Sequence, residues 1–347
     1  MNKSGKVTIN DIAAAAGVSK TTVSRFLNGR KDLMSEKTSE RIAQVIERYE
    51  YRPSEIARNL KKETTNLVGV LIADITSPFS TALICGIEEY LTTQGFTTLF
   101  MNSRDNLDRE MANIESLKTK GVSGLIINTT SYNNNYLIKT VNSGIPIVLS
   151  DRYVKGYPFD IVTNDHVAGI DALVRHLKVQ GFNRPVMFTQ EWINNSPRML
   201  RREAFIKAVE NHYGYDPQAD IYVVDYDDQT LEDLVSQVFL RMKPEDVPVI
   251  FCVNSVTTIR VFKVLKQRGY DIPRQVGICG PEDWDWQNEL NWPALITPAV
   301  TTTAIHSTRL GRKSAELLVR RMKEPGLPQQ EILLPYELRV RASTRLG

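Results

Sequence analysis

Short apolar runs alternate with amphipathic stretches of helix length along most of this 347-residue chain, from Asn66 onward. About eight of the runs have the length of buried strands, at residues 67–72, 98–101, 124–127, 145–149, 186–188, 221–224, 249–253 and 276–279. Amphipathic stretches between them predict helices, for example over residues 80–93, 109–120, 167–180, 199–213 and 255–268. Buried strands that alternate with helices indicate βαβ units and parallel sheets. We expect two sheets with a cleft between them rather than one large sheet, because the series restarts near Asp165.

The first 52 residues contain no strand-like run and predict short helices. Thr8 and Asp11 have the spacing of a capping box at the start of the first helix. The apolar face of that helix is predicted to consist of Ile12, Ala15 and Ala16. A Gly-containing turn at residues 17–19 leads to a second helix over residues 20–27, and a third helix would brace the pair through Ile42, Val45, Ile46 and Tyr49. Two short helices joined in this way form a helix-turn-helix.

In a helix-turn-helix, the N-terminal residues of the second helix enter the major groove of DNA. Here Ser19 can cap that helix, and Lys20 and Arg25 can donate to guanine N7 and O6, whereas a Thr methyl group can contact a thymine methyl group. Hydroxyl groups suit phosphates, which position the protein without specifying a sequence. The residues of this segment that we expect at DNA are Thr8, Ser19, Lys20, Thr21, Thr22, Ser24, Arg25 and Asn28.

The charge distribution fits a DNA-binding head. Residues 1–62 carry a formal charge of +6 and the remainder carries −3, which together give the net charge of +3. A basic head on a slightly acidic body indicates that the head meets a polyanion and the body does not. The alternative is a basic face that is merely solvated.

The sequence also bounds where the protein works. No apolar run approaches the ~20 residues of a membrane span, and the N-terminus lacks the apolar region of a secretory signal. The cysteines lie far apart without a CxxC pair, which fits a reducing cytosol and excludes a disulfide framework; they are Cys85, Cys252 and Cys279. We expect a cytoplasmic, nucleoid-associated protein with no membrane partner.

Residues 8–29, TINDIAAAAGVSKTTVSRFLNG, closely resemble the headpiece of the lactose-repressor/galactose-repressor family of bacterial transcription regulators. The resemblance implies a sequence-specific regulator, most often a repressor, that binds double-stranded operator DNA as a homodimer. Two headpieces that read two half-sites imply a pseudo-palindromic operator. Three helices with no role at DNA remain the alternative for this segment.

Residues 54–62 form about two turns of predicted helix, which is marginal in water by itself and is expected to fold when a surface receives it. The segment resembles the hinge helix of the same family, with its pattern Pro-x-x-x-Ala-Arg-x-Leu. The resemblance makes Leu60 an apolar wedge in the minor groove, with Ala57 and Arg58 beside it. The alternative is a simple linker.

The rest of the chain resembles the family's effector-binding core more loosely, and that core is similar to a periplasmic sugar-binding protein. The implied fold is α/β, with two doubly wound parallel-sheet subdomains joined by three crossovers. We expect a headpiece at 1–52, a hinge at 53–65, an N-terminal subdomain at 66–163 plus 294–324 and a C-terminal subdomain at 164–293 plus 325–347.

Ligands of open α/β sheets bind at the carboxyl ends of strands. The resemblance places effector-binding residues there, with His166 and Glu282 standing where the family often has Asn and Asp. Ser255 replaces an Asp and weakens one expected contact. The expected set is Asp74, Phe79, Asp151, Arg152, His166, Ser196, Arg201, Asn254, Glu282, Trp284 and Trp286. The two Trp around an Asp resemble the branch that represses 2-keto-3-deoxygluconate catabolism, which implies a sugar or sugar-acid effector.

No motif of an enzyme stands out: GxGxxG, GxxxxGK[ST], GxSxG and HExxH are absent, and the four histidines show no metal-binding spacing. We therefore expect no catalytic residues, no cofactor and no metal. Two alternatives stay open for the core, a regulator that answers to a non-sugar effector or a protein co-repressor, and a solute-binding protein. The predicted DNA-binding headpiece argues against a solute-binding protein.

Overall fold

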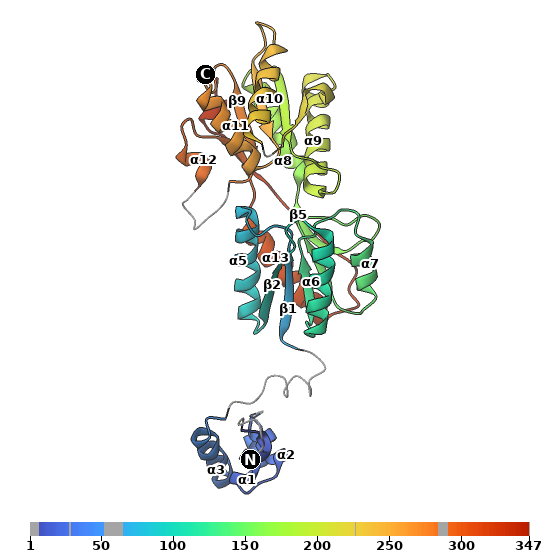
Figure 1. Cartoon of the computed structure of the whole chain (residues 1–347), viewed down its shortest axis with the longest axis vertical. Coiled ribbons are helices and arrows are strands. Elements are labelled where there is room, and N and C mark those ends of the chain that lie inside the picture. The colour runs from blue at the N-terminus through green and yellow to red at the C-terminus, as the bar shows by residue number, and fades with distance from the viewer. Residues whose placement is uncertain (1–6, 28, 52–64, 226, 284–290, 347) are drawn as a thin grey trace. The chain divides into compact units, whose positions relative to one another are not determined.

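The computed structural model describes residues 7–27, 29–51, 65–225, 227–283 and 291–346. Contacts within the chain divide it into two compact units, Met1–Thr65 and Asn66–Gly347, which Figure 1 shows in blue and in the remaining colours. Each unit has its own hydrophobic core, and each is described by itself.

Within residues 7–51, the first unit consists of three α-helices and one short 3-10 helix: α1 (Ile9–Ala15), α2 (Lys20–Leu27), η1 (Lys31–Leu33) and α3 (Glu36–Arg48). Ile12, Val23 and Ile42 are fully buried where the helices meet. The predicted capping box is confirmed, because Asp11 N–H donates to Thr8 Oγ1 and Thr8 N–H donates to the Asp11 carboxylate at 2.8 Å.

Two predicted core positions of this unit are wrong. Ala15 is exposed and Ala13 is buried in its place, since positions 12, 13 and 16 share one face of α1. Tyr49 is 44% exposed because it is the C-cap of α3 and lies beyond the last turn that packs on the other helices.

Two six-stranded sheets form the centre of the second unit in its described residues. The first sheet is parallel and has the order β11-β5-β4-β3-β1-β2. Its strands are β1 (Leu67–Ile72), β2 (Thr97–Asn102), β3 (Gly124–Ile127), β4 (Ile147–Ser150), β5 (Asp160–Asn164) and β11 (Glu331–Leu334).

The second sheet has the order β12-β10-β9-β8-β6-β7 and is parallel except for β12, which pairs antiparallel with β10. Its strands are β6 (Arg184–Thr189), β7 (Ile221–Val223), β8 (Pro248–Cys252), β9 (Gly277–Pro281), β10 (Thr301–Ala304) and β12 (Glu337–Arg339). The predicted two-sheet α/β architecture is confirmed.

Helices flank both sheets (Figure 1). The helices beside the first sheet are α5 (Pro78–Thr93), α6 (Leu107–Thr119), α7 (Asn135–Val141) and α13 (Ser307–Lys323). Those beside the second are α8 (His166–Val179), α9 (Ser196–Tyr213), α10 (Asp228–Leu240), α11 (Ser255–Gln267) and α12 (Trp292–Leu295), with the short η2 (Gln218–Asp220) and η3 (Ala342–Thr344).

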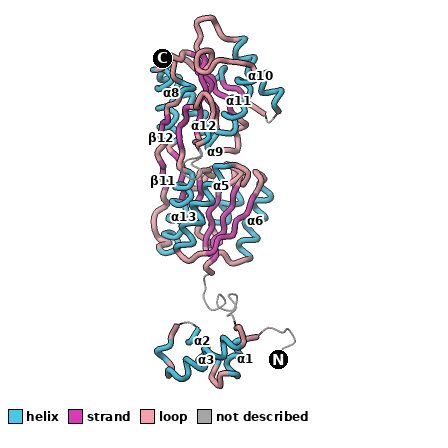
Figure 2. The backbone as a smooth tube through the Cα atoms, turned by 90° about the vertical axis from the view of Figure 1, so that its left-hand side faces the viewer, coloured by secondary structure: helices cyan, strands magenta, loops and turns pink. Residues whose placement is uncertain are grey.

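The chain passes between the sheets at three places, from β5 to α8, from β10 to α13 and from β11 to β12 (Figure 2). The expected subdomain boundaries therefore need correction. Residues 294–324 were expected wholly in the first subdomain, but β10 extends the second sheet beside β9. Residues 325–347 were expected in the second subdomain, but β11 pairs with β5 in the first sheet. Polar threonines concealed β10 in the apolar pattern, whereas β11 is a short run of one glutamate and three apolar residues.

Helices α5 and α13 touch at their backbones because two glycines face across the contact. A Cβ atom at Gly311 would lie 2.1 Å from the Leu83 carbonyl oxygen, and one at Gly86 would lie 1.9 Å from that of Thr308. This contact holds α13, the helix that follows the crossing from β10, beside α5 on the first sheet, whose core includes Leu83, Ile87 and Leu318.

Gly311→Ala is expected to lower the free energy of unfolding by about 3 kcal/mol, because backbone atoms in two helices must separate to admit the methyl group. Urea unfolding followed by circular dichroism measures the change. Gly326→Ala is the matched control, since a Cβ atom there meets nothing within 4 Å. Equal effects of the two substitutions would refute the close helix contact.

Candidate functional site

Helix α2 presents a polar edge to solvent. Val23 is buried and fixes the helix on the core, whereas Lys20, Thr21 and Arg25 are exposed. Ser19 caps the helix as predicted, because its Oγ accepts the Thr22 N–H at 3.1 Å. This arrangement leaves two cationic side chains and one threonine of α2 available to a groove of DNA.

The other predicted DNA-contacting residues differ in their surroundings. Thr8 is half-buried and its hydroxyl group caps α1, and Thr22 and Ser24 are half-buried. Four further candidates lie outside the described residues: Asn28, Ala57, Arg58 and Leu60.

A polar cavity in the second unit lies at the carboxyl ends of strands from both sheets. Loops after β1 to β4 and the first turn of α5 contribute Asp74, Ser77, Phe79, Ser80, Asp105, Asn128, Asp151 and Arg152. The second sheet and its helices contribute Gln190, Asn195, Pro197, Arg198, Arg201, Asn254, Val256 and Glu282. Carboxyl ends of parallel strands are where open α/β sheets bind ligands.

The buried ion pair of Arg201 and Glu282 dominates one wall of this cavity. Arg201, on α9, is 4% exposed, and its Nη1 donates to Glu282 Oε1 and to the Val253 carbonyl oxygen, each at 2.9 Å. Glu282 Oε2 accepts from the N–H and the hydroxyl group of Ser255, at 3.2 and 2.6 Å. Ser255, which departs from the family pattern, thus serves Glu282, and both carboxylate oxygens of Glu282 are engaged.

Among the described residues that line the cavity, Asp151 has a buried acceptor atom that no protein group satisfies. It is 5% exposed, and its Oδ1 has no hydrogen-bond partner among the described residues. Burial raises the pKa of Asp151 to about 6, against the opposing charges of Arg201 and Arg152. The backbone of Asp151 has a φ of 69° and that of Glu282 a φ of 78°. Such left-handed conformations are strained for both residue types and cluster at binding sites.

The remaining predicted residues of the cavity wall are held by neighbours. Arg152 Nη1 donates at 3.0 Å to both Asp105 Oδ1 and the Thr129 carbonyl oxygen. Asp74 Oδ1 accepts from the Thr76 N–H at 3.0 Å. Asn254 Nδ2 donates to Gln190 Oε1 at 2.8 Å, while its Oδ1 caps α11. Phe79 is half-buried, lines the cavity and packs on the core of the first sheet.

Two predicted effector contacts, His166 and Ser196, are not on the cavity wall. His166 Nδ1 lies 2.6 Å from Tyr336 Oη and 3.5 Å from Arg201 Nε. Ser196 Oγ accepts the Tyr153 N–H at 2.8 Å, so it joins the first turn of α9 to the loop after β4. Both side chains were placed by their sequence position alone. In the structure Ser196 Oγ and His166 Nδ1 contact protein groups, and His166 Nε2 is buried without a hydrogen-bond partner among the described residues.

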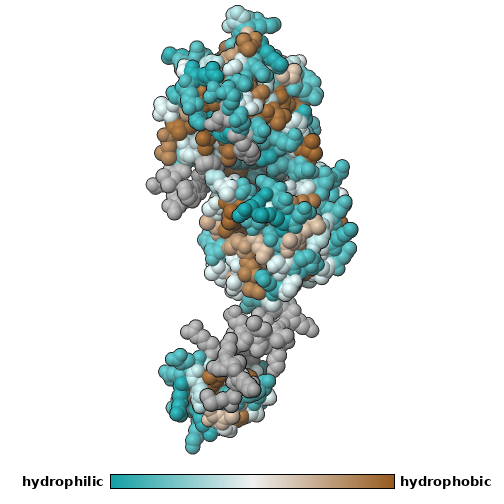
Figure 3. Space-filling view, in the orientation of Figure 1, coloured by the Kyte–Doolittle hydropathy of each residue, from teal (hydrophilic) through white to brown (hydrophobic). Residues whose placement is uncertain are grey.

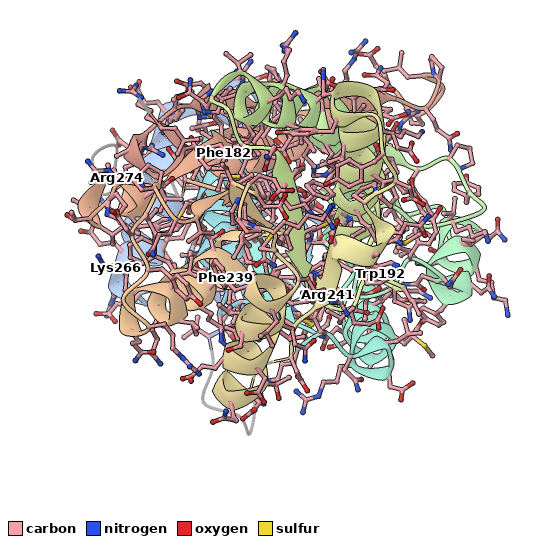
Figure 4. The ribbon with its side chains drawn as sticks, turned by 90° about the horizontal axis from the view of Figure 1, so that it is seen from above. Phe182, Trp192, Phe239, Arg241, Lys266 and Arg274 are labelled. Carbon is pink, nitrogen blue, oxygen red and sulfur yellow. The ribbon has the colours of Figure 1, made fainter. Side chains whose placement is uncertain are left out.

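Trp284 and Trp286 lie outside the described residues. The expected effector-binding set left out seven polar residues that line the cavity: Ser77, Ser80, Asp105, Asn128, Gln190, Asn195 and Arg198. Asp105, Asn128 and Gln190 also follow strand ends, a signal that could have found them. The central carbon of the Arg202 guanidinium, on α9, lies 4.7 Å from the centre of the Trp192 ring. Figure 4 labels Trp192.

The described residues contain no group of three or more His, Cys, Asp or Glu that could hold a metal ion. None of their helices is long and apolar enough to cross a membrane. On the face of the second unit that Figure 3 shows, hydrophilic and hydrophobic residues are interspersed.

A helix-turn-helix unit followed by a two-sheet α/β unit with a polar cavity defines a ligand-responsive DNA-binding regulator. Residues 8–54 match the family described as bacterial regulatory proteins, lacI family. Residues 65–338 match the periplasmic binding proteins and sugar binding domain of LacI family. The chain belongs to the LacI family. It is a DNA-binding transcription regulator and not an enzyme, which confirms the resemblance in the headpiece and the core.

Curated relatives extend over nearly the whole chain. The HTH-type transcriptional regulator KdgR of Bacillus subtilis (strain 168) is 30% identical over 328 residues, which are 94% of this chain and 94% of KdgR. The HTH-type transcriptional regulator PtxS of Pseudomonas aeruginosa is 30% identical and covers 98% of this chain and 96% of its own length. These similarities support the predicted KdgR-like branch.

Solved structures share the fold. The lac repressor dimer bound to operator and the anti-inducer ONPF has a TM-score of 0.83 at 20% identity, with coverage of 98% of this chain and 99% of that chain. A LacI family transcriptional regulator from Enterococcus faecium with bound ribose has a TM-score of 0.68 at 25% identity, with coverage of 81% and 99%.

Proposed function

We propose that the protein is a repressor of carbohydrate or sugar-acid catabolism genes, controlled by a small sugar-type effector in the polar cavity. As a homodimer it would place two α2 helices on a pseudo-palindromic operator, in the cytoplasm at the nucleoid. Relatives named KdgR, PtxS and ribose operon repressor support this assignment.

The main observation in favour of a sugar-type effector is the chemistry of the cavity wall. Carboxylates offer acceptors, whereas arginine, asparagine and glutamine side chains offer donors, and Phe79 adds an apolar face. A sugar presents hydroxyl groups that donate and accept at once, together with CH faces. Asp151 Oδ1, buried without a partner, is the acceptor that a ligand hydroxyl group would satisfy.

Control of DNA binding follows from the position of the cavity. Its walls come from both sheets, so a bound effector favours one angle between the sheets over another. Effector binding then shifts DNA affinity only by the difference between its affinities for the two states. We propose the hinge residues Ala57, Arg58 and Leu60 as the elements that carry this change to the operator.

Operator release tests the proposal. An operator is selected from random-sequence DNA by the full-length protein, and its binding is followed by fluorescence anisotropy at fixed salt with sugars and sugar acids, 2-keto-3-deoxygluconate among them. Release or tightening by one compound supports a sugar-type effector. Strong operator binding that no compound changes would refute it and favour a non-sugar effector or a protein co-repressor.

Arg25→Ala is expected to weaken binding to the selected operator by about 1–3 kcal/mol and to relax the base preference at one position, because an arginine can contact guanine bidentately. Binding to a set of single-base operator variants measures both effects. Arg48→Ala, which removes an exposed arginine from α3, is the matched control. A uniform loss over all variants would assign Arg25 to a phosphate instead.

A further inference from the structure

Tyr336 lies on a crossover between the two sheets, in the two-residue link from β11 to β12. Its ring packs directly on Gly169 of α8, where an added Cβ atom would lie 2.5 Å from the ring. Its hydroxyl group lies 2.6 Å from Nδ1 of His166, the first residue of α8 after another crossover. One hydrogen bond thus joins two of the three connections between the sheets.

The neighbours of His166 determine its charge and its tautomer. Arg201 Nε always carries a proton and approaches Nδ1 at 3.5 Å. Burial raises the pKa of the Tyr336 phenol, so its hydroxyl group keeps its proton. Burial, reinforced by the charge of Arg201, lowers the pKa of His166 well below its ordinary value. A neutral imidazole that accepts the Arg201 Nε–H at Nδ1 carries its proton on Nε2, an atom that is buried without a hydrogen-bond partner among the described residues, and Nδ1 then also accepts from the Tyr336 hydroxyl group.

These contacts hold Arg201 from two sides. Glu282 and the Val253 carbonyl oxygen hold Nη1, and the imidazole of His166 lies against Nε. We propose that Tyr336 is a positioning residue that acts through His166 Nδ1, fixes the guanidinium of Arg201 in the cavity and links it to the crossovers. The inference rests on the proposed function in that Arg201 contacts the effector.

The two amide analogues of histidine separate this role from direct contact with an effector. The amide of Asn overlaps Nδ1 of an imidazole, whereas the amide of Gln overlaps Nε2. His166→Asn therefore keeps an acceptor toward Tyr336, and His166→Gln removes it while keeping a polar group at Nε2. Tyr336→Phe removes the hydroxyl group and leaves the ring on Gly169.

The first test needs no effector. Full-length protein labelled with ¹⁵N-histidine is studied at pH 7 by long-range ¹H–¹⁵N correlation, and the signals of His166 are assigned by their loss in His166→Asn. We expect the Nε2–H tautomer, and a changed Nδ1 shift in Tyr336→Phe. A charged ring, the Nδ1–H tautomer or an unchanged Nδ1 shift would overturn the proposal.

The second test measures coupling, as the ratio of operator Kd with and without the compound that releases the wild-type protein. Tyr336→Phe and His166→Gln should reduce this ratio roughly 3- to 30-fold, with operator affinity in the absence of the compound unchanged. His166→Asn should retain most of the ratio. His176→Gln is the control, because the amide of Gln can keep the hydrogen bond of His176 Nε2 to Thr344.

A retained ratio in His166→Gln together with a lost ratio in His166→Asn would assign Nε2 to the effector and overturn the positioning role. If no compound releases the wild-type protein, the sugar-type effector of the proposed function is wrong, and the histidine signals alone decide whether Tyr336 positions Arg201.

Discussion

Arg201→Ala is expected to abolish the response to the effector and to lower the free energy of unfolding by about 3–5 kcal/mol. The second effect arises because Glu282 would remain buried with its charge uncompensated on the side that Arg201 Nη1 now occupies. Operator binding with and without the releasing compound measures the first effect, and urea unfolding measures the second.

A double substitution separates these effects. Arg201→Leu with Glu282→Leu removes both charges together, so most of the lost stability should return. The effector response should stay absent, since neither polar group is present. An effector response in the double variant would move the binding site elsewhere, and a persistent loss of stability would show that packing, and not the orphaned charge, accounts for the cost.

Much of the fold was predictable because apolar strands and amphipathic helices have different periods. The strand at residues 67–72 was predicted with the bounds that β1 has in the structure. Strands β5, β10, β11 and β12 were missed. In β10 the signal fails because three of its four residues are threonines. The hydroxyl groups of Thr301 and Thr302 are buried with partners that only the folded chain supplies, such as Arg341.

The site was predictable in outline for the same reason, since strand ends converge on one edge whatever the side chains are. Arg201, Asp151 and Glu282 were expected in the cavity and line it. The sequence could not assign their partners. Ser255 donates to Glu282 across 27 positions of the sequence, and Tyr336 contacts His166 across 170 positions. No local sequence pattern connects the members of either pair.

Asp151→Asn is expected to stabilise the protein more at pH 8 than at pH 4. The folded-state pKa of Asp151 is raised from 3.8 to about 6 by burial. The folded protein therefore holds a proton that the unfolded chain releases between these values, and stability from this group falls as the pH rises through about 6. The stability gain of Asp151→Asn at pH 8 relative to pH 4 should be about 2–3 kcal/mol. Urea unfolding at both pH values measures it, and Asp74→Asn is the control; the same gain in both variants would refute the assignment to Asp151.

The same titration distinguishes the two effector classes. A hydroxyl group of a neutral sugar donates to the ionised Asp151 carboxylate, so affinity for the effector should fall by up to about tenfold per pH unit below pH 6. A sugar acid whose carboxylate lies beside Asp151 favours the protonated side chain, so its affinity should instead rise as the pH falls. Titration of the releasing compound from pH 5 to 8 decides between them. In Asp151→Asn either dependence should vanish, and a dependence that persists would place the titrating group outside Asp151.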